Sequence, residues 1–383
     1  MIPLSVPNLC GNELKYVKKC IKTEWISTAG NYISLFEKKV ASYLNSKYAV
    51  ACINGTSALQ VALRILEVGN GDEVIVPTLT FIAPINSVIY NNAKPIFMDC
   101  DNFYNMDVEK TIKFIKNETV FRNNFTFNKK TKKRIPAILP VHLWGNAAKL
   151  ERLVKICKER NISIVEDAAE SFGTKYTNGN LKNRFTGTIG KVGCLSFNGN
   201  KIITTGGGGM ILTNNQKLAK KAKYLINQAK DNPLTYICND IGYNFRLTNI
   251  QAALGLAQLE NFKTFKKKKN QIHLFYKNEI SKIHGLILSP IPEYADNNKW
   301  LNILKINTKI YKKKVLEIVM KMKKNNIEVR PIWYPNHLQK KFKSYQRYEI
   351  KNAIKLFNST LCLPSSTNIK INDLKKVVKA LNV

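Results

Sequence analysis

The chain has 383 residues, of which 44% are hydrophobic and 10% aromatic, a composition typical of a globular protein with one large and one smaller domain. Its N-terminal stretch, MIPLSVPNLCGNELKYVKKC, contains no long apolar run. We therefore predict neither a signal peptide nor a membrane span, and we expect a cytoplasmic protein. The eight cysteines are scattered singly, which indicates neither a disulfide framework nor a metal site.

The formal net charge is +35, from 61 Lys and Arg against 26 Asp and Glu. Much of this charge lies in lysine clusters at residues 129–134 and 266–269, and such a field attracts polyanions. The clusters follow no groove-reading motif, so we interpret them as solvated surface. We expect no specific nucleic-acid partner and no membrane insertion, although the field would favour a small polyanionic substrate.

Apolar strands and helices alternate through the first two-thirds of the chain. Short buried strands separated by helices of this length predict an α/β fold with a mainly parallel sheet covered on both faces. In such sheets ligands bind at the carboxyl ends of the strands. The predicted strands cover residues 48–52, 73–77, 94–99, 136–141 and 163–167, and the predicted helices cover 56–69, 81–92 and 149–160.

The rest of the chain suggests a division into two domains. Residues 121–134 indicate a polar excursion between strands, and residues 248–262 an amphipathic helix. The lysine run beyond that helix marks the exit from the large domain. We therefore predict a large domain of residues 1–262 and a smaller C-terminal α+β domain of residues 263–383, with the extreme N-terminus packing on the small domain.

The segment NGTSALQVAL follows the first predicted strand. Gly55 ends that strand, and Thr56 and Ser57 open a helix, where hydroxyls and unpaired backbone N–H groups can bind phosphate. Ser and Thr are also ordinary helix caps, so the motif alone leaves a structural role open.

The segment IVEDAAES places Asp167 at the carboxyl end of another predicted strand. A carboxylate at this edge of the sheet could pair with the protonated ring nitrogen of a cofactor. The alternative is that Asp167 caps a helix that follows the strand.

The segment SFNGNKIITTGGGGMI places Lys201 between Ser196, at a strand end, and the four glycines 206–209. Lys201 is either an ordinary surface charge or an amine that forms a Schiff base with a ligand. Glycines permit close backbone approach and positive φ. A phosphate cradle, a carboxylate and an amine nucleophile, all at strand ends, together predict a site for pyridoxal 5′-phosphate (PLP).

Along nearly its full length the chain resembles the DegT/StrS family of PLP-dependent nucleotide-sugar aminotransferases. The resemblance rests on NGTSALQVAL, GDEVIVPTLTFIAPINSV, IVEDAAES, LSFNGNKIITTGGGGMILT and GYNFRLTNIQAALGLAQL, in this order. It implies the PLP-dependent transferase fold type I (aspartate aminotransferase-like), with a mainly parallel seven-stranded sheet in the large domain. MIPLSVPNL and SFNGNKIITTGGGGMI resemble the subgroup that serves legionaminic acid and bacillosamine-type sugar pathways.

The resemblance also implies roles for single residues. Lys201 would carry the cofactor and then move the proton between cofactor and substrate, and Asp167 would bind the pyridine nitrogen. The partner subunit's Asn244 would reach the cofactor phosphate, so that a homodimer would complete each active site. The further residues implied to hold the cofactor are Thr56, Ser57 and Ser196 at its phosphate and Phe81 stacked on its ring.

The resemblance also points to Glu170, His337 and Arg246, and these three residues and Phe81 each have alternative roles. Phe81 could be a core residue at a helix start, and Glu170 could contact either cofactor or substrate. His337 matches a histidine near the sugar pocket but could be structural. Arg246 could support the loop that carries Asn244 or belong to a structural ion pair.

The leading functional hypothesis is transfer of an amino group from glutamate to C4 of a nucleotide-linked 4-keto-6-deoxy-sugar. The two half-reactions of this transfer should show ping-pong kinetics. Relatives with histidine in place of the lysine are sugar dehydratases, so Lys201 favours transamination over that alternative. A non-catalytic PLP-binding regulator, or a basic nucleic-acid-binding protein on the same scaffold, has only the charge in its support. UDP or GDP, and the stereochemistry of the new amine, stay open.

Overall fold

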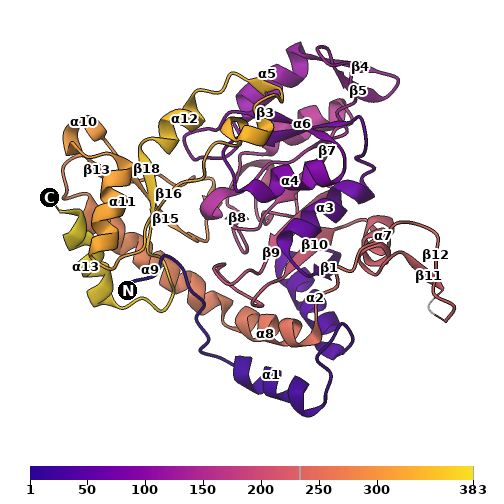
Figure 1. Cartoon of the computed structure of the whole chain (residues 1–383), viewed down its shortest axis with the longest axis horizontal. Coiled ribbons are helices and arrows are strands. Elements are labelled where there is room, and N and C mark those ends of the chain that lie inside the picture. Colours follow the sequence, from indigo (N-terminus) through magenta and orange to yellow (C-terminus); the bar gives the residue numbers. More distant parts are fainter. Residues whose placement is uncertain (233, 383) are drawn as a thin grey trace.

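The computed structural model describes residues 1–232 and 234–382, so Val383, the end of the second predicted domain, lies outside the described residues. A large sheet carries helices on both faces, and a smaller sheet lies beside it (Figure 1). The large sheet contains β1 (Tyr48–Cys52), β2 (Glu73–Pro77), β3 (Lys94–Met98), β6 (Ala137–Ile138), β7 (Ser163–Asp167), β9 (Val192–Ser196), β10 (Gly209–Thr213) and β17 (Arg347–Tyr348); the small sheet contains β13 (Leu286–Leu288), β15 (Asn302–Ile306), β16 (Arg330–Pro331) and β18 (Thr360–Leu363).

Three two-stranded ribbons and thirteen α-helices complete the described chain. The ribbons pair β4 (Thr119–Arg122) with β5 (Phe125–Asn128), β8 (Lys175–Tyr176) with β14 (Ala295–Asp296), and β11 (Lys230–Asn232) with β12 (Ile237–Cys238). The helices are α1 (Glu13–Lys22), α2 (Asn31–Leu44), α3 (Gly55–Ile65), α4 (Ile82–Tyr90), α5 (Val108–Asn117), α6 (Glu151–Glu159), α7 (Gln216–Ile226), α8 (Asn249–Glu260), α9 (Phe262–Ile280), α10 (Thr308–Tyr311), α11 (Val315–Lys324), α12 (Asn352–Phe357) and α13 (Ile371–Leu381).

The large sheet confirms the predicted mainly parallel α/β fold. Its strands lie in the order β1-β10-β9-β7-β6-β2-β3-β17. Strand β10 runs antiparallel to both neighbours, and all other pairs are parallel. Seven strands come from the first 262 residues, as predicted, and β17 adds an eighth at the edge. The carboxyl ends of β2, β6, β7 and β9 therefore share one edge of the sheet, the usual place for a ligand.

Both faces of the central strands are buried. In β2, Val74 and Val76 pack in the cluster that includes the apolar side chains of α3, whereas Ile75 packs with those of α5 and α6. Successive side chains of a strand point to opposite faces, so each set meets a different helical layer. This explains why residues 74–77 of β2 are all apolar rather than alternating.

The predicted polar excursion is instead the β4–β5 hairpin. Its two-residue turn consists of Asn123 and Asn124, with φ of 49° and 63°. Asn tolerates this left-handed conformation, which suits the twist of a two-residue hairpin. The Asn-Asn pair was therefore a turn signal that the sequence analysis missed.

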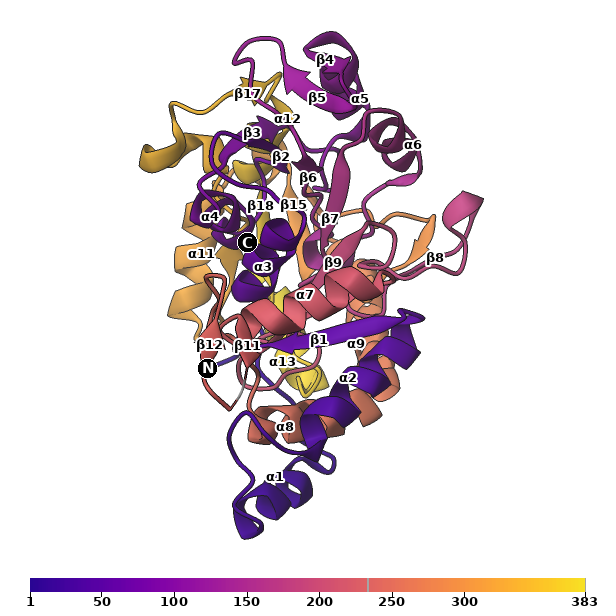
Figure 2. The same cartoon turned by 90° about the vertical axis from the view of Figure 1, so that its right-hand side faces the viewer.

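Helix α8 is more deeply buried than the predicted amphipathic helix. Seven of its twelve residues are buried, and both α1 and α2 pack against it. Close packing depends on small residues, since a Cβ on Gly255 would lie 2.8 Å from the Phe36 ring. Figure 2 shows α1 and α2 on either side of α8, with α1 at the outer edge of the molecule.

Residues beyond 262 contribute to both sheets. The small sheet, ordered β13-β15-β18-β16, is wholly antiparallel, and α9, α11 and α13 bury a separate apolar cluster against it. Strand β17 instead joins the large sheet, where the Asp99 carboxylate accepts the backbone N–H groups of residues 351–353, each at 2.9 Å. Ile2 forms a bridge with Ile327. We propose that residues 263–383 form a small unit with one excursion onto the large sheet.

A bilayer-spanning helix needs about 20 mostly apolar residues, and the described part of the chain contains no such helix. The lysine run at 266–269 is also not wholly a solvated surface. Lys269 projects from α9 into the core and is only 2% exposed. Its Nζ donates to the carbonyl oxygens of Trp300, at 2.7 Å, and Ser365. Burial lowers the pKa of Lys269 to about 7, because a charged amine is disfavoured away from water.

Replacing Lys269 with Met is expected to change how stability depends on pH. With a pKa of about 7 when folded, against 10.5 ordinarily, Lys269 binds fewer protons in the folded chain than in the unfolded chain above pH 7. The free energy of unfolding of the wild type should therefore rise relative to Lys269→Met by up to about 1.4 kcal/mol per pH unit between about pH 7 and 10. Urea denaturation across this range measures the difference. The exposed Lys267→Met is the control and should run parallel to wild type; a constant gap for Lys269→Met would contradict the buried charge.

Candidate active site

Six of the predicted site residues line a cavity of about 250 Å³, where β7 and β9 end and α3 begins. Side chains from both parts of the chain contribute, because two tryptophans from beyond residue 262 also line the cavity. The predicted residues that line it are Thr56, Phe81, Asp167, Glu170, Ser196 and Lys201.

Lys201 lies in the loop between β9 and β10, and its side chain is 13% exposed. Its Nζ is 3.7 Å from Glu170 Oε1 and 4.1 Å from the centre of the Trp300 ring. Trp300 also holds the loop, since its Nε1–H donates to the carbonyl oxygen of Asn200 at 2.7 Å. An amine held between a buried carboxylate and an aromatic face is not an ordinary surface charge, so that alternative is wrong.

The glycines after Lys201 return the chain to the sheet. Gly206 has a φ of +81°, in the left-handed region that favours glycine. A Cβ on Gly209 would lie 2.4 Å from backbone atoms of Asn54. Strand β10 therefore starts in direct contact with the beginning of α3, which brings the lysine loop beside the predicted phosphate cradle.

Glu170 is buried beside Lys201. Its Oε2 accepts the backbone N–H of Trp144 at 2.7 Å, and its backbone carbonyl accepts from the Asn298 side chain at 3.0 Å. Burial raises the pKa of Glu170 to about 7, although the charge of Lys201 acts in the opposite direction. A carboxyl group with such a pKa can exchange protons near neutral pH.

Asp167 is the last residue of β7 and is buried. Its Oδ1 accepts the backbone N–H of Ala169 at 2.9 Å, whereas no donor among residues 1–232 and 234–382 reaches its Oδ2. Burial raises the pKa of Asp167, and the nearby Lys201 lowers it. Turns rather than a helix follow β7, so the helix-capping alternative is wrong. One carboxylate oxygen is thus left for a cationic partner.

The start of α3 forms the third part of the site. Asn54 caps the helix, because its Oδ1 accepts the backbone N–H of Ser57 at 2.8 Å. The first N–H groups of any helix have no acceptor within it and favour an anion. A Cβ on Gly55 would lie 2.9 Å from Ser196 Cβ, so α3 begins in contact with the end of β9. Thr56 and Ser196 line the cavity; Ser57 does not.

Three other candidates lie outside this cavity. His337 is buried, and its Nδ1 lies 2.6 Å from Thr78 Oγ1; burial lowers the pKa of its imidazole. Asn244 is exposed and forms a bridge with Asn227. Arg246 lines a different hollow, and within the described chain no carboxylate lies at ion-pair distance from it. The structure therefore brings none of the three to the Lys201 cavity of the same subunit.

The sequence analysis missed several residues that line the cavity, among them Thr80, Asn200, Trp300 and Trp333. The two tryptophans come from the C-terminal part, where the sequence analysis considered only His337 as a candidate. Trp333 lies four residues before His337, so that segment offered a signal, whereas the only signal for Trp300 was rarity, since the chain has four tryptophans.

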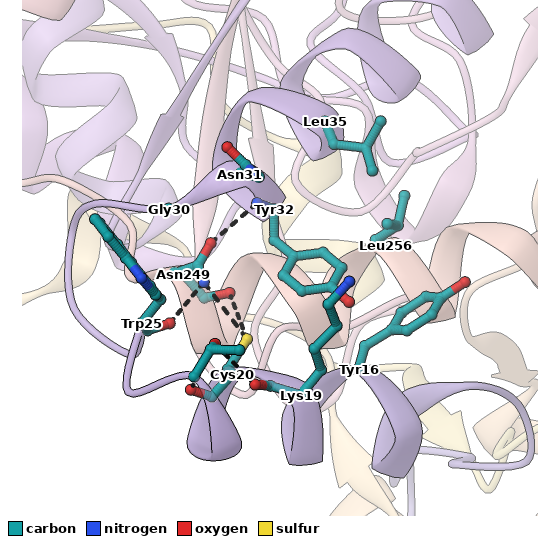
Figure 3. Close-up of a pocket in the computed structure, with 11 residues that line it drawn as sticks. Tyr16, Lys19, Cys20, Trp25, Gly30, Asn31, Tyr32, Leu35, Asn249 and Leu256 are labelled. Atoms are coloured by element: carbon teal, nitrogen blue, oxygen red, sulfur yellow. Dashed lines mark hydrogen bonds between the residues drawn. The ribbon is translucent and has the colours of Figure 1, made fainter.

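A larger hollow of about 710 Å³ lies between α1, α2 and α8 (Figure 3). The rings of Tyr16 and Tyr32 stand 5.5 Å apart at its wall. The side-chain amide of Asn249 already has hydrogen-bond partners there, because it accepts from the Tyr32 N–H and donates to the Trp25 carbonyl. Its described lining includes no carboxylate and none of the predicted site residues, so size alone does not make it the catalytic site.

Comparisons with known proteins identify the family of this chain. The model of the DegT/DnrJ/EryC1/StrS aminotransferase family matches residues 7–382. The putative pyridoxal phosphate-dependent aminotransferase EpsN of Bacillus subtilis is 35% identical over 390 residues, covering 99% of this chain and 95% of that protein. The GDP-perosamine synthase of Caulobacter vibrioides is 34% identical over 383 residues, covering 100% and 97%.

Solved structures share the fold. A DegT DnrJ EryC1 StrS aminotransferase from Brucella abortus matches with a TM-score of 0.85 and 27% identity, over 97% of this chain and 94% of that one. PseC of Helicobacter pylori matches with a TM-score of 0.87 over 99% and 98%, at an identity of 22% that speaks for the fold alone. The predicted fold type I is thus confirmed. The chain belongs to the DegT/DnrJ/EryC1/StrS aminotransferase family and is a PLP-dependent aminotransferase.

Proposed function

We propose that this enzyme moves an amino group from glutamate to C4 of a nucleotide-linked 4-keto-6-deoxy-sugar, such as UDP- or GDP-4-keto-6-deoxy-GlcNAc, in bacterial surface-sugar biosynthesis. The observation that carries the reaction class is Lys201 Nζ, 3.7 Å from Glu170 in a cavity that Asp167 also lines. Relatives named GDP-perosamine synthase and UDP-4-amino-4,6-dideoxy-N-acetyl-beta-L-altrosamine transaminase support the substrate class. We propose the legionaminic acid and bacillosamine-type subgroup on the segments that resemble it.

The cavity fits PLP, which when bound supplies an electron sink for the substrate. Lys201 would hold it covalently and then move a proton through Nζ. Asp167 Oδ2, which has no donor within the described chain, would pair with the ring nitrogen and keep it charged. The remaining proposed contacts are the phosphate with the α3 N-terminus, Thr56, Ser57 and Ser196, the ring with Phe81, and cofactor or substrate with Glu170.

We further propose a homodimer in which the partner subunit's Asn244 completes each site. Two observations support this. Asn244 is exposed and lies outside its own cavity. The adjoining β11–β12 ribbon projects from the molecule (Figure 1), and its neighbours Leu234 and Ile241 are 87% and 78% exposed. Large exposed apolar patches mark protein–protein interaction sites, and these side chains are candidates for one.

An absorbance titration tests the proposed reaction. Glutamate should convert the yellow PLP-loaded enzyme to the pyridoxamine phosphate form, and UDP- and GDP-4-keto-6-deoxy-GlcNAc are then added to separate samples. The sugar that restores the yellow form identifies the nucleotide, and its product should carry a new amine by mass. If glutamate leaves the spectrum unchanged, the proposed donor is wrong. A product that has lost water without gaining an amine would indicate a dehydratase.

A further inference from the structure

Thr80 and Trp333 meet at the Lys201 cavity from different parts of the chain. Thr80 follows β2, and Trp333 follows β16 in the C-terminal part. Asn336 fastens the two segments together, because its side-chain amide donates to the Thr80 carbonyl at 2.8 Å and its backbone N–H to the Thr78 carbonyl at 2.8 Å. The Trp333 ring lies 5.2 Å from that of Phe81, at 61°. This wall of the cavity is therefore held in place before any ligand binds.

Each of these two side chains carries a buried polar atom that lacks a partner. Thr80 is 2% exposed, and neither its Oγ1 nor Trp333 Nε1 has a hydrogen-bond partner within the described residues. Buried polar groups are normally hydrogen-bonded, and leaving one unpaired is unfavourable. Because both residues line the cavity that holds Lys201, a ligand bound there is the natural partner.

The chemistry of the two atoms narrows the choice of ligand group. An indole N–H can only donate, whereas a threonine hydroxyl can donate and accept. Apart from Lys201, the described lining of the cavity includes no cationic side chain. This pair of neutral groups therefore lacks the charge-assisted partner that favours an anion, and it matches an uncharged oxygen. The other parts of the cavity, Lys201, Asp167 and the α3 start, already suit the aldehyde, ring nitrogen and phosphate of the cofactor.

We propose that Thr80 Oγ1 and Trp333 Nε1 form a subsite for an uncharged oxygen substituent, a hydroxyl or an acetamido carbonyl, on the sugar ring of the nucleotide-sugar substrate. The subsite rests on the proposed function, since it assigns the sugar rather than glutamate to this wall. It sets which ring substituents the enzyme accepts, because a sugar without the matching oxygen leaves both buried atoms unpaired.

The test uses Trp333→Phe and Thr80→Val, which keep a ring and a similar shape while removing the two polar atoms. The probes are UDP-4-amino-4,6-dideoxy-N-acetylglucosamine and GDP-perosamine, titrated by calorimetry into cofactor-free protein, with kcat and KM of both half-reactions measured on loaded enzyme. Each variant should raise the Kd of the preferred sugar about ten-fold or more. The fold-loss in kcat/KM should be larger for the sugar half-reaction than for the glutamate half-reaction.

Thr360→Val is the matched control, because Thr360 is a fully buried threonine in β18 outside the cavity, and it should leave the Kd unchanged. A double-mutant cycle uses analogues of the preferred sugar that lack the oxygen at C2 or at C3. One analogue should bind wild type about ten-fold more weakly than the parent sugar does. The same analogue should bind Trp333→Phe as tightly as the parent sugar binds that variant. Unchanged sugar affinity in both variants would overturn the subsite, as would equal losses in both half-reactions. If wild type converts neither nucleotide sugar, the proposed function falls, and the subsite falls with it.

Discussion

Lys201→Ala is expected to lower the rate of transamination by at least about a thousand-fold, the scale of losing a positioned base together with a covalent attachment point. Glu170, 3.7 Å from the amine, offers a carboxylate and no replacement nucleophile for an aldehyde. Two measurements check this: the single-turnover reaction with glutamate and, on separate PLP-loaded samples without glutamate, borohydride reduction followed by the mass of the intact protein. Wild type should gain the mass of the reduced cofactor, whereas Lys201→Ala should not.

Lys191→Ala is the matched control for this result. Lys191 is exposed and precedes β9, the strand that leads to Lys201. This variant should keep the wild-type rate and the wild-type mass gain. Wild-type turnover in Lys201→Ala, or a cofactor that remains attached to that variant after reduction, would contradict the assignment of Lys201.

Residues close in sequence to a strand end were the part of the site that could be predicted. Strands β2 and β7 are short, mostly buried runs with an apolar centre, and a parallel sheet brings their carboxyl ends to one edge. Asp167 and Ser196 therefore reached the cavity as expected, since each ends a strand. The position of the Lys201 loop near the same sheet edge could also be predicted, because the glycines after Lys201 indicate a tight return to the sheet.

Contacts between distant parts of the chain could not be predicted in this way. Periodicity shows which face of an element is buried but not what lies opposite. Lys269 stands in a run of four lysines, and only the packing of α9 against Trp300 and Ser365 makes it a core residue. Trp333 reaches the cavity because Asn336 joins its segment to residues 78–80, a contact that spans more than half of the chain. The same contact left His337 paired with Thr78 outside the cavity.

Mixing two defective variants should restore activity if the sites are shared between subunits. Lys201→Ala lacks the amine, and Asn244→Asp places a negative charge where the proposed dimer holds the cofactor phosphate, so each variant alone should be nearly inactive. In a mixed dimer, one site combines the intact Lys201 of one chain with the intact Asn244 of the other. Random exchange makes about half of the dimers mixed, so about a quarter of wild-type activity should return.

The recovery separates two arrangements that a single variant cannot. If Asn244 served the cavity of its own chain, no mixed dimer would contain an intact site, and activity would stay near zero. The control mixes Lys201→Ala with a chain that carries both substitutions. In this mixed dimer the first chain supplies an intact Asn244, but neither chain supplies Lys201, so no site is intact. Activity from the first mixture and none from the control would place Asn244 across the interface, and it would explain why an exposed residue outside the cavity belongs to the site.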